Sequence, residues 1–267
     1  MFLFLISFAY LWVYEGDSLL RGFSKGTVIT RDSVSVGNEV EEFSWESSGF
    51  VSDIIRIDKD IYFAVSDAGI VARIRDNGKM DTVLTREGSL ISLGKKGKVL
   101  TVGLSPFGKI FFVRGSEIVD SLSAPADNIY CMFEFGGEFL IGTGPKGKVY
   151  QLVKDGEFEE YFVTEASSVT KWRIKDKNLF LGTSNPGLVY RIDKNNEGKI
   201  YYDPGFEEIN GLGYSGDTLC VSGLLSRQNE SVGVIKFLLK NREYEVYAGT
   251  PILCGEESGG KFYAGES

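Results

Sequence analysis

The chain has 267 residues, of which 43% are hydrophobic and 25% charged, as is usual for a soluble globular protein that buries one large core. Its formal net charge of −8 and its pI of about 4.9 argue against nucleic acid or an anionic membrane as a partner, because both require a basic surface. The chain contains no histidine, which excludes Ser-His-Asp and Cys-His catalysis and histidine metal sites.

The N-terminal segment Met1–Tyr14 carries no charged side chain. It is shorter than the roughly 20 residues that a membrane-spanning helix needs, so we expect no transmembrane span. Its apolar character predicts a signal-peptide-like segment, and hence a periplasmic or secreted protein. No basic residue precedes the apolar run and Phe8–Tyr10 is a poor cleavage motif, which leaves a hydrophobic strand or a truncated start as the alternative.

A repeated unit organises the rest of the chain: an apolar strand, a short turn that closes on glycine, and a second alternating strand. The glycine that opens the second strand recurs with gaps of 39, 39, 40 and 46 residues. A period of about 40 residues, with about four strands per unit, is typical of β-propeller blades. The clearest copies are Phe63–Ile74, Leu100–Val113, Phe139–Leu152 and Phe180–Ile192, and the aligned glycines are Gly69, Gly108, Gly147, Gly187 and Gly233.

The strands of one unit are named A to D here, from the propeller axis outward. Gly-Gly and Asp-Gly pairs mark the hairpin turns between them, because such turns need a positive φ. No helical periodicity follows the N-terminal run. The other complete units are predicted to begin near Ser52, Ser89, Val169 and Glu208. In the third unit, strand A is predicted over Ile129–Phe135, B over Glu138–Thr143, C over Lys148–Val153 and D over Phe158–Thr164.

The two ends of the chain carry incomplete units. Ile252–Cys254 and Lys261–Ser267 supply only strands A and B of a sixth unit. Near the other end, Lys25–Arg31 is similar to a C strand and Val40–Ser47 could be a D strand. The predicted fold class is therefore all-β: a six-bladed β-propeller over residues 25–267, whose last blade is closed by N-terminal strands pairing with C-terminal strands. The alternative is a fragment of a propeller with seven or more blades.

The segment Gly142–Tyr150, GTGPKGKVY, and its copy Gly182–Tyr190, GTSNPGLVY, resemble the repeats of bacterial exported β-propeller proteins. These proteins belong to the broad group of WD-repeat-like and quinoprotein-like propellers. The resemblance spans residues 25–267, but the Gly-His and Trp-Asp pairs of true WD repeats are missing. Because many unrelated functions share this fold, the resemblance implies architecture only.

Motifs that suggest chemistry are explained better by the repeat. Gly142–Gly147 satisfies G-x-G-x-x-G, but a strand follows instead of the helix that a phosphate site needs. The acidic clusters lack the ligand spacing of a calcium loop, so we predict no metal, no cofactor and no catalytic residue. Cys131, Cys220 and Cys254 lie in apolar runs and are predicted to be buried free thiols, with a Cys220–Cys254 bridge as the alternative.

The remaining candidates for function are surfaces. The turns between strands B and C lie at one end of a propeller, around the mouth of its channel, where an exposed aromatic residue favours contact with a partner. We therefore expect a non-enzymatic binding or scaffold protein that engages a protein or polymer there. The alternative is a channel-mouth hydrolase or lactonase-type enzyme that uses carboxylates and a divalent metal. The candidate binding residues are the turn residues Asp67, Phe107, Lys146, Asn185 and Arg227, and Trp172 and Arg173 on a predicted A strand. For Trp172, the alternative interpretation is packing between blades.

Overall fold

The computed structural model describes the backbone of residues 12–15, 22–24, 27–29, 34–36, 51–66, 68–193, 195–227, 230–239, 242–247, 252–258 and 261–266. Side chains are described for residues 51–66, 68–193, 195–226, 232–238, 242, 243 and 245. The described part is nearly all strand, with one short 3-10 turn, η1 (Lys154–Gly156). The chain divides into two compact units, Ser47–Tyr202 and the pair of segments Met1–Glu46 and Asp203–Ser267. The single domain over residues 25–267 stays a prediction.

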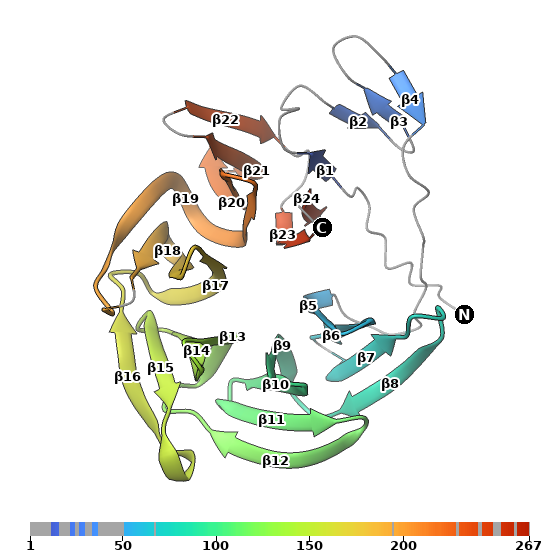
Figure 1. Ribbon diagram of the computed structural model, residues 1–267, viewed down its shortest axis with the longest axis vertical. Helices are drawn as coiled ribbons and strands as arrows, with labels where there is room; N and C mark the ends of the chain where they lie inside the picture. Colours follow the sequence, from blue (N-terminus) through green and yellow to red (C-terminus); the bar gives the residue numbers. More distant parts are fainter. Residues whose placement is uncertain are drawn as a thin grey trace. The chain divides into compact units, whose positions relative to one another are not determined.

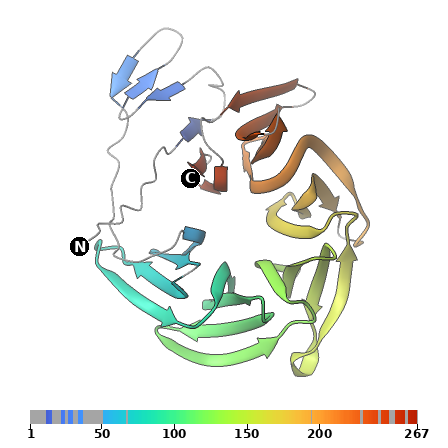
Figure 2. The same cartoon turned by 180° about the vertical axis from the view of Figure 1, so that it is seen from behind.

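The unit Ser47–Tyr202 contains three successive four-stranded antiparallel sheets and a fourth sheet in which β18 pairs with β17 and β19 (Figures 1 and 2). The strands are β5 (Val51–Ile57), β6 (Asp60–Val65), β7 (Ile70–Ile74), β8 (Met80–Thr85), β9 (Ser89–Lys96), β10 (Val99–Ser105), β11 (Lys109–Arg114), β12 (Glu117–Ser123), β13 (Asn128–Phe135), β14 (Glu138–Gly144), β15 (Lys148–Leu152), β16 (Phe158–Val163), β17 (Ser168–Lys175), β18 (Asn178–Ile192) and β19 (Gly198–Ser215). The bounds of β13 to β16 confirm the strands predicted for the third unit to within one residue.

The fourth sheet differs from the prediction at one turn. The sequence predicts two strands joined by a turn around Asn185, whereas β18 continues through it. The reason is a backbone partner, because the Ser167 N–H donates to the carbonyl oxygens of both Ser184 and Asn185 at 3.0 Å. Asn185 has a φ of 51°, a conformation that asparagine tolerates better than most residues.

Alternation along the first strand of each sheet fills the spaces between neighbouring sheets. On β13, Ile129 and Met132 pack with Ile110 and Phe112 of the second sheet. Cys131 and Phe133 on the same strand pack with the fourth sheet, because successive strand residues point to opposite faces. Figure 1 shows the sheets of this unit side by side, with β5, β9, β13 and β17 innermost.

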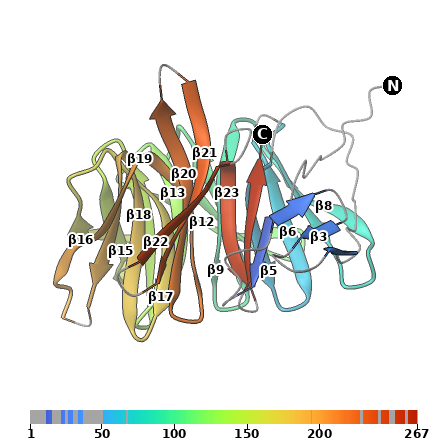
Figure 3. The same cartoon turned by 90° about the horizontal axis from the view of Figure 1, so that it is seen from above.

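The repeated turn glycine has a structural role that explains its spacing. Gly69, Gly108 and Gly147 have φ values of 59°, 57° and 53°. A Cβ at these positions would lie 1.8, 2.0 and 2.1 Å from the carbonyl oxygens of Arg86, Ala126 and Ala166, in the loop that leads to the next sheet. Glycine therefore lets each B–C turn contact the following D–A loop, so the two kinds of turn lie at the same end of the sheets. Figure 3 shows the strands from the side, with turns at both of their ends.

The second unit contains a β-meander and a β-hairpin that belong to the same sheet. From β19 the chain continues into β20 (Thr218–Arg227), β21 (Glu230–Leu239) and β22 (Arg242–Tyr247), which pair antiparallel in chain order. β23 (Ile252–Ser258) pairs with β24 (Lys261–Glu266), and Gly255 of β23 meets Gly211 of β19 in parallel. The polar segment Ser226–Ser231 lengthens the β20–β21 hairpin, since Ser226 pairs with Ser231 and Arg227 with Glu230.

The strand that pairs with the C-terminal end is not the one predicted. β24 pairs antiparallel with β1 (Trp12–Glu15), so that Phe262 lies opposite Tyr14. The predicted C strand, Lys25–Arg31, contributes β3 (Thr27–Ile29), which pairs only with β2 (Gly22–Ser24) and β4 (Val34–Val36) in the described part. β1 consists mainly of Trp, Val and Tyr, residue types that strongly favour strands.

Two predictions about the N-terminal region are not tested by this pairing. The predicted D strand Val40–Ser47 lies outside the described residues. The export signal stays a prediction, although its last residues, Trp12–Tyr14, belong to β1. None of the described residues form a helix of the length and apolar character that would cross a membrane.

Candidate functional site

The predicted turn residues lie at equivalent places in successive sheets. Phe107 and Lys146 are 39 residues apart and exposed at the turn between the second and third strands, and Asn185, a further 39 residues on, is exposed at the equivalent place within β18. Phe107 is the most exposed large hydrophobic residue of the described part, at 67%. Asp67 lies outside the described residues, and Arg227 ends β20 with its side chain outside them.

A shallow cavity of about 770 Å³ lies beside Phe107, lined by Ala68, Thr85, Arg86, Glu87 and Gly88. A Cβ added to Gly88 would lie 3.5 Å from Cε2 of Phe107 and 2.9 Å from Cδ1 of Leu104. Gly88 therefore allows the exposed ring to lie against the D–A loop, with a φ of 108° that L side chains rarely adopt. The ring is therefore a neighbour of Gly88, one of the residues that line the cavity.

Cations surround a second aromatic ring close to this cavity. The guanidinium of Arg86 lies 5.5 Å from the ring centroid of Phe111, and the ammonium of Lys109 lies 5.9 Å from it. Arg86 also donates a 2.8 Å hydrogen bond to the carbonyl oxygen of Thr85. The site combines exposed apolar surface, fixed cations and the Glu87 carboxylate, which suits recognition of a surface with both apolar and charged groups.

Trp172 and Arg173 are not at the turn end. Both are half-buried on β17, and the indole of Trp172 stacks on Phe133 with ring centroids 4.9 Å apart and an interplanar angle of 20°. This contact joins the third and fourth sheets, which is the packing role that the sequence left open for Trp172. A binding role for either residue stays a prediction.

A second cluster, which the sequence reasoning missed, lies on the innermost strands. Its members Asp53, Ser92, Cys131 and Lys171 each precede the turn glycine of their repeat by 16 residues. Each lies at a register shift in its strand, where a β-bulge re-aims the side chains. Counting backward from the aligned glycines would have found this cluster.

Asp53 is the centre of that cluster. Its Oδ2 accepts a 2.7 Å hydrogen bond from the Leu93 N–H, and its Oδ1 accepts one of 3.0 Å from the Ile54 N–H. The ammonium of Lys171 lies 3.9 Å from Oδ1, with both side chains about four-fifths buried. Burial nevertheless raises the pKa of Asp53, against the opposing effects of Lys171 and the two hydrogen bonds. One carboxylate therefore links the inner strands of the first, second and fourth sheets.

The other members of the cluster tie neighbouring inner strands together. The hydroxyl of Ser92 donates a 2.6 Å hydrogen bond to the Ile129 carbonyl, and the Cys131 thiol donates one of 3.7 Å to the Val169 carbonyl. Burial raises the pKa of Cys131, and likewise of Cys220, to about 12, so both remain protonated thiols at neutral pH. Both are free, which confirms the prediction for these two and excludes a Cys220–Cys254 bridge.

The glycine-rich motif Gly142–Gly147 covers the end of β14 and the turn to β15, as the repeat predicts. The Thr143 hydroxyl donates a 2.9 Å hydrogen bond to the Lys148 carbonyl across this turn, and the Thr183 hydroxyl makes the equivalent bond to Leu188 at 3.1 Å. Within the residues that the structure describes, no group of three or more Cys, Asp and Glu side chains is arranged to hold a metal ion.

Comparisons with known proteins identify the architecture of the chain. No protein-family model and no curated protein sequence matches the chain. Among solved structures, it is similar to a catalytically inactive His-to-Ala variant of virginiamycin B lyase from Staphylococcus aureus with quinupristin, at 14% identity over 97% of this chain and 99% of that one, with a TM-score of 0.66.

Two further structures show the same likeness. The WD40 β-propeller domain of Doa1 has 13% identity over 82% of this chain and 90% of its own, with a TM-score of 0.57. The extracellular domain of a two-component-system candidate from B. thetaiotaomicron has 11% identity over 90% of this chain and 35% of its own, with a TM-score of 0.63. At these identities the likeness shows architecture alone, and the fold of this chain is that of a β-propeller.

Proposed function

We propose that this chain is a non-enzymatic binding propeller that engages a protein or polymer through the turn end of its sheets. One observation carries the proposal: Phe107 is 67% exposed beside the cavity of about 770 Å³. A large apolar ring held in water at a turn has an unfavourable hydration free energy that a partner would relieve. Lys146 and Asn185 extend the surface. The sequence predicts Asp67 and Arg227 at the equivalent turns of their own repeats.

The test compares two exposed hydrophobic residues of the same unit. Immobilised wild-type protein, Phe107→Ala and Ile174→Ala are exposed to an extract of the source cells and to its secreted fraction. Ile174, 39% exposed on β17, is the matched control. We expect a ligand that wild type and Ile174→Ala retain and Phe107→Ala loses at least tenfold. Equal retention by all three proteins, or none by the wild type, would refute the turn-end surface.

We further propose that six blades form the propeller and that β1 closes the last one. The strand register supports six blades. The first strand of each proposed blade has a register shift where it pairs with the second strand of that blade. These first strands are β5, β9, β13, β17, β19 and β23. The test introduces two cysteines, Trp12→Cys and Ala264→Cys, into a Cys254→Ser variant, because Trp12 lies directly opposite Ala264 in the β1–β24 pair. This pair should form a disulfide, whereas Trp12→Cys with Lys261→Cys, three residues out of register, should not.

An extracytoplasmic location is also part of the proposal. The apolar segment Met1–Tyr14 supports it, and one similar structure is an extracellular domain. Removal of that segment would remove most of β1, so location and closure are compatible only if the segment is retained. The intact mass of the protein recovered from outside the cytoplasm tests both proposals, and a mature N-terminus beyond Glu15 would overturn closure by β1.

A channel-mouth enzyme is the second candidate, favoured by the likeness to a lyase over 97% of this chain. That lyase structure is an inactive His-to-Ala variant, and this chain contains no histidine, so an enzyme here would need carboxylates instead. A divalent metal bound to the folded state would raise the melting temperature by mass action. Thermal scans with calcium, magnesium, manganese and zinc test this candidate, and no shift with any of them would count against it.

A further inference from the structure

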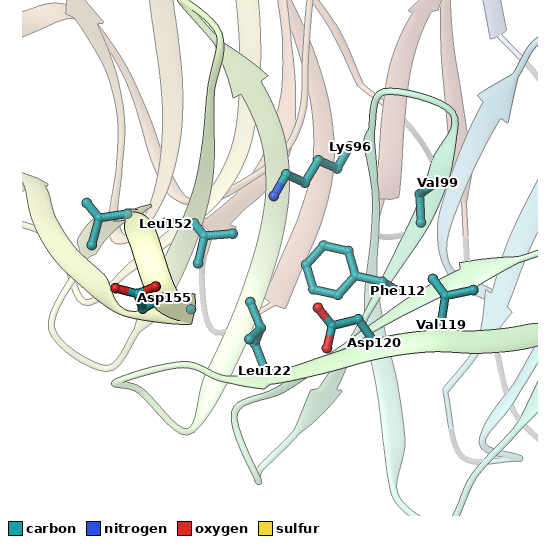
Figure 4. Close-up of a pocket in the computed structure, with 10 residues that line it drawn as sticks. Lys96, Val99, Phe112, Val119, Asp120, Leu122, Leu152 and Asp155 are labelled. Carbon is teal, nitrogen blue, oxygen red and sulfur yellow. The ribbon is translucent and has the colours of Figure 1, made fainter.

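A second cavity lies at the other end of the same unit, away from the Phe107 turns. It has a volume of about 390 Å³, within the range of about 300–1,000 Å³ that is common for small-molecule sites. Figure 4 shows side chains from the second and third sheets that surround it. The lining residues are Lys96, Val99, Phe112, Val119, Asp120, Leu122, Leu152, Val153, Asp155 and Gly156.

The apolar wall of this cavity is part of the protein core. Phe112 is buried and packs against Phe139, with ring centroids 5.9 Å apart. Val99, Leu122 and Leu152 pack against the same cluster while they also face the cavity. The wall is therefore fixed before any ligand arrives, which lowers the entropic cost of binding.

Charges of both signs surround the wall without pairing. The Lys96 ammonium lies 5.7 Å from the Phe112 ring centroid and 5.9 Å from that of Phe139. Among the described side chains, Lys96 has no carboxylate partner, and Asp120 and Asp155 have no cationic partner. Asp120 accepts a 2.7 Å hydrogen bond from the Ser121 N–H, which orients its carboxylate.

The positions of these charges select the kind of ligand. Since the lysine and the two aspartates make no ion pair with one another, the positive and negative ends of the site are separate points. A ligand that matches both must carry separated opposite charges on an apolar body. The two charged termini and apolar side chains of a dipeptide meet this requirement, whereas the neutral hydroxyls of a sugar do not.

We propose that this cavity binds a short apolar peptide with both termini free. The peptide ammonium contacts the carboxylate of Asp120, its carboxylate contacts Lys96, and its side chains lie against Phe112, Leu122 and Leu152. The site is separate from the turn-end surface and does not depend on it.

The probe is Leu-Leu, compared with N-acetyl-Leu-Leu and Leu-Leu amide by isothermal titration calorimetry. Each modified peptide lacks one terminal charge, so each should bind about tenfold more weakly than Leu-Leu, as the loss of one charge-assisted contact predicts. Failure of Leu-Leu to bind at millimolar concentration would overturn the proposal. Equal binding of all three peptides would also overturn it, because the charges would then play no part.

Variants assign each terminus to its partner. Asp120→Asn should weaken the binding of Leu-Leu about tenfold but leave the binding of N-acetyl-Leu-Leu unchanged. Lys96→Met should likewise weaken the binding of Leu-Leu about tenfold but leave the binding of Leu-Leu amide unchanged. Lys79→Met, in the exposed turn between β7 and β8, is the matched control and should bind all three peptides as wild type does. Unchanged Leu-Leu affinity in both cavity variants, with unchanged melting temperatures, would contradict the assignment.

Discussion

Two aspartates of the unit Ser47–Tyr202 are both ion-paired, yet their pKa values move in opposite directions. On the outer strand β8, Asp81 accepts from Arg73 Nη2 at 2.7 Å and from Arg75 Nε at 3.1 Å, and these bonds lower its pKa. On the inner strand β5, burial raises the pKa of Asp53 despite Lys171 at 3.9 Å. The difference follows from geometry, since Asp81 has two guanidinium partners and 28% exposure, while Asp53 has one longer contact and 18%.

The comparison separates two uses of an ion pair. The Asp81 pair stabilises the charged form of the carboxylate, so it contributes to folding at neutral pH. The Asp53 carboxylate costs free energy as a buried charge, and its value lies in linking three inner strands. Removing one partner of such a buried pair is expected to lower the free energy of unfolding strongly, whereas replacing both partners is expected to change it little.

The largest expected effect comes from removing only the cation of the inner pair. Lys171→Met leaves the Asp53 carboxylate buried without its counter-ion, which should lower the free energy of unfolding by about 3–5 kcal/mol. Urea denaturation at pH 7 measures it, with the exposed Lys146→Met as control. A loss below about 1 kcal/mol would show that Asp53 is solvated well enough to stand alone.

An intermediate effect is expected on the outer strand. Asp81→Asn keeps the shape but removes the charge that Arg73 and Arg75 bind, and should cost roughly 1–2 kcal/mol because water partly replaces these partners. The same denaturation experiment measures it. If Asp81→Asn were more damaging than Lys171→Met, the comparison would be reversed.

A smaller effect is expected when both inner charges are replaced. Asp53→Asn with Lys171→Met keeps an acceptor for one of the two backbone N–H groups and leaves no buried charge, so its stability should lie within about 2 kcal/mol of wild type. The double-mutant cycle isolates the pair. A double variant as unstable as Lys171→Met alone would mean that the lysine acts through packing.

Acidification should change the contributions of Asp53 and Asp81 to folding stability in opposite directions. The folded-state pKa of Asp81 lies below its ordinary value of 3.8, so its stabilisation is present above pH 3.8 and is lost as pH falls toward the folded value. The folded-state pKa of Asp53 lies above 3.8, so its cost is relieved as pH falls through that raised value. Relative to Asp53→Asn, wild type should gain stability on acidification, whereas relative to Asp81→Asn it should lose stability. Parallel urea titrations across acidic pH would show the difference, and changes of the same sign would contradict it.

The sequence predicts the periodic part of this molecule well, because turn glycines and alternating strands are local signals. The strands around Phe139 and the exposed turn residue Phe107 follow from one repeat compared with the next. The pairing of β1 with β24 was missed, because an apolar run such as Trp12–Tyr14 can be a signal segment or a strand, and only a distant partner decides between them.

The inner cluster and the second cavity were harder to predict for different reasons. Asp53 and Lys171 are 118 residues apart, and they meet only because equivalent bulges aim them toward each other. The cavity near Phe112 takes its lining from separate segments of two sheets, none of which carries a motif. Period alone locates equivalent positions, but it does not say which of them come into contact.

The central claim, that the turn end binds a partner, is tested most directly by hydrogen–deuterium exchange on the protein with and without its captured ligand. The account predicts slower exchange for the amides of Thr85–Ser89 and Ser105–Gly108, with no change in the turns around Gly115 and Gly136 at the other end of the sheets. Protection confined to the turns around Gly115 and Gly136 would contradict it.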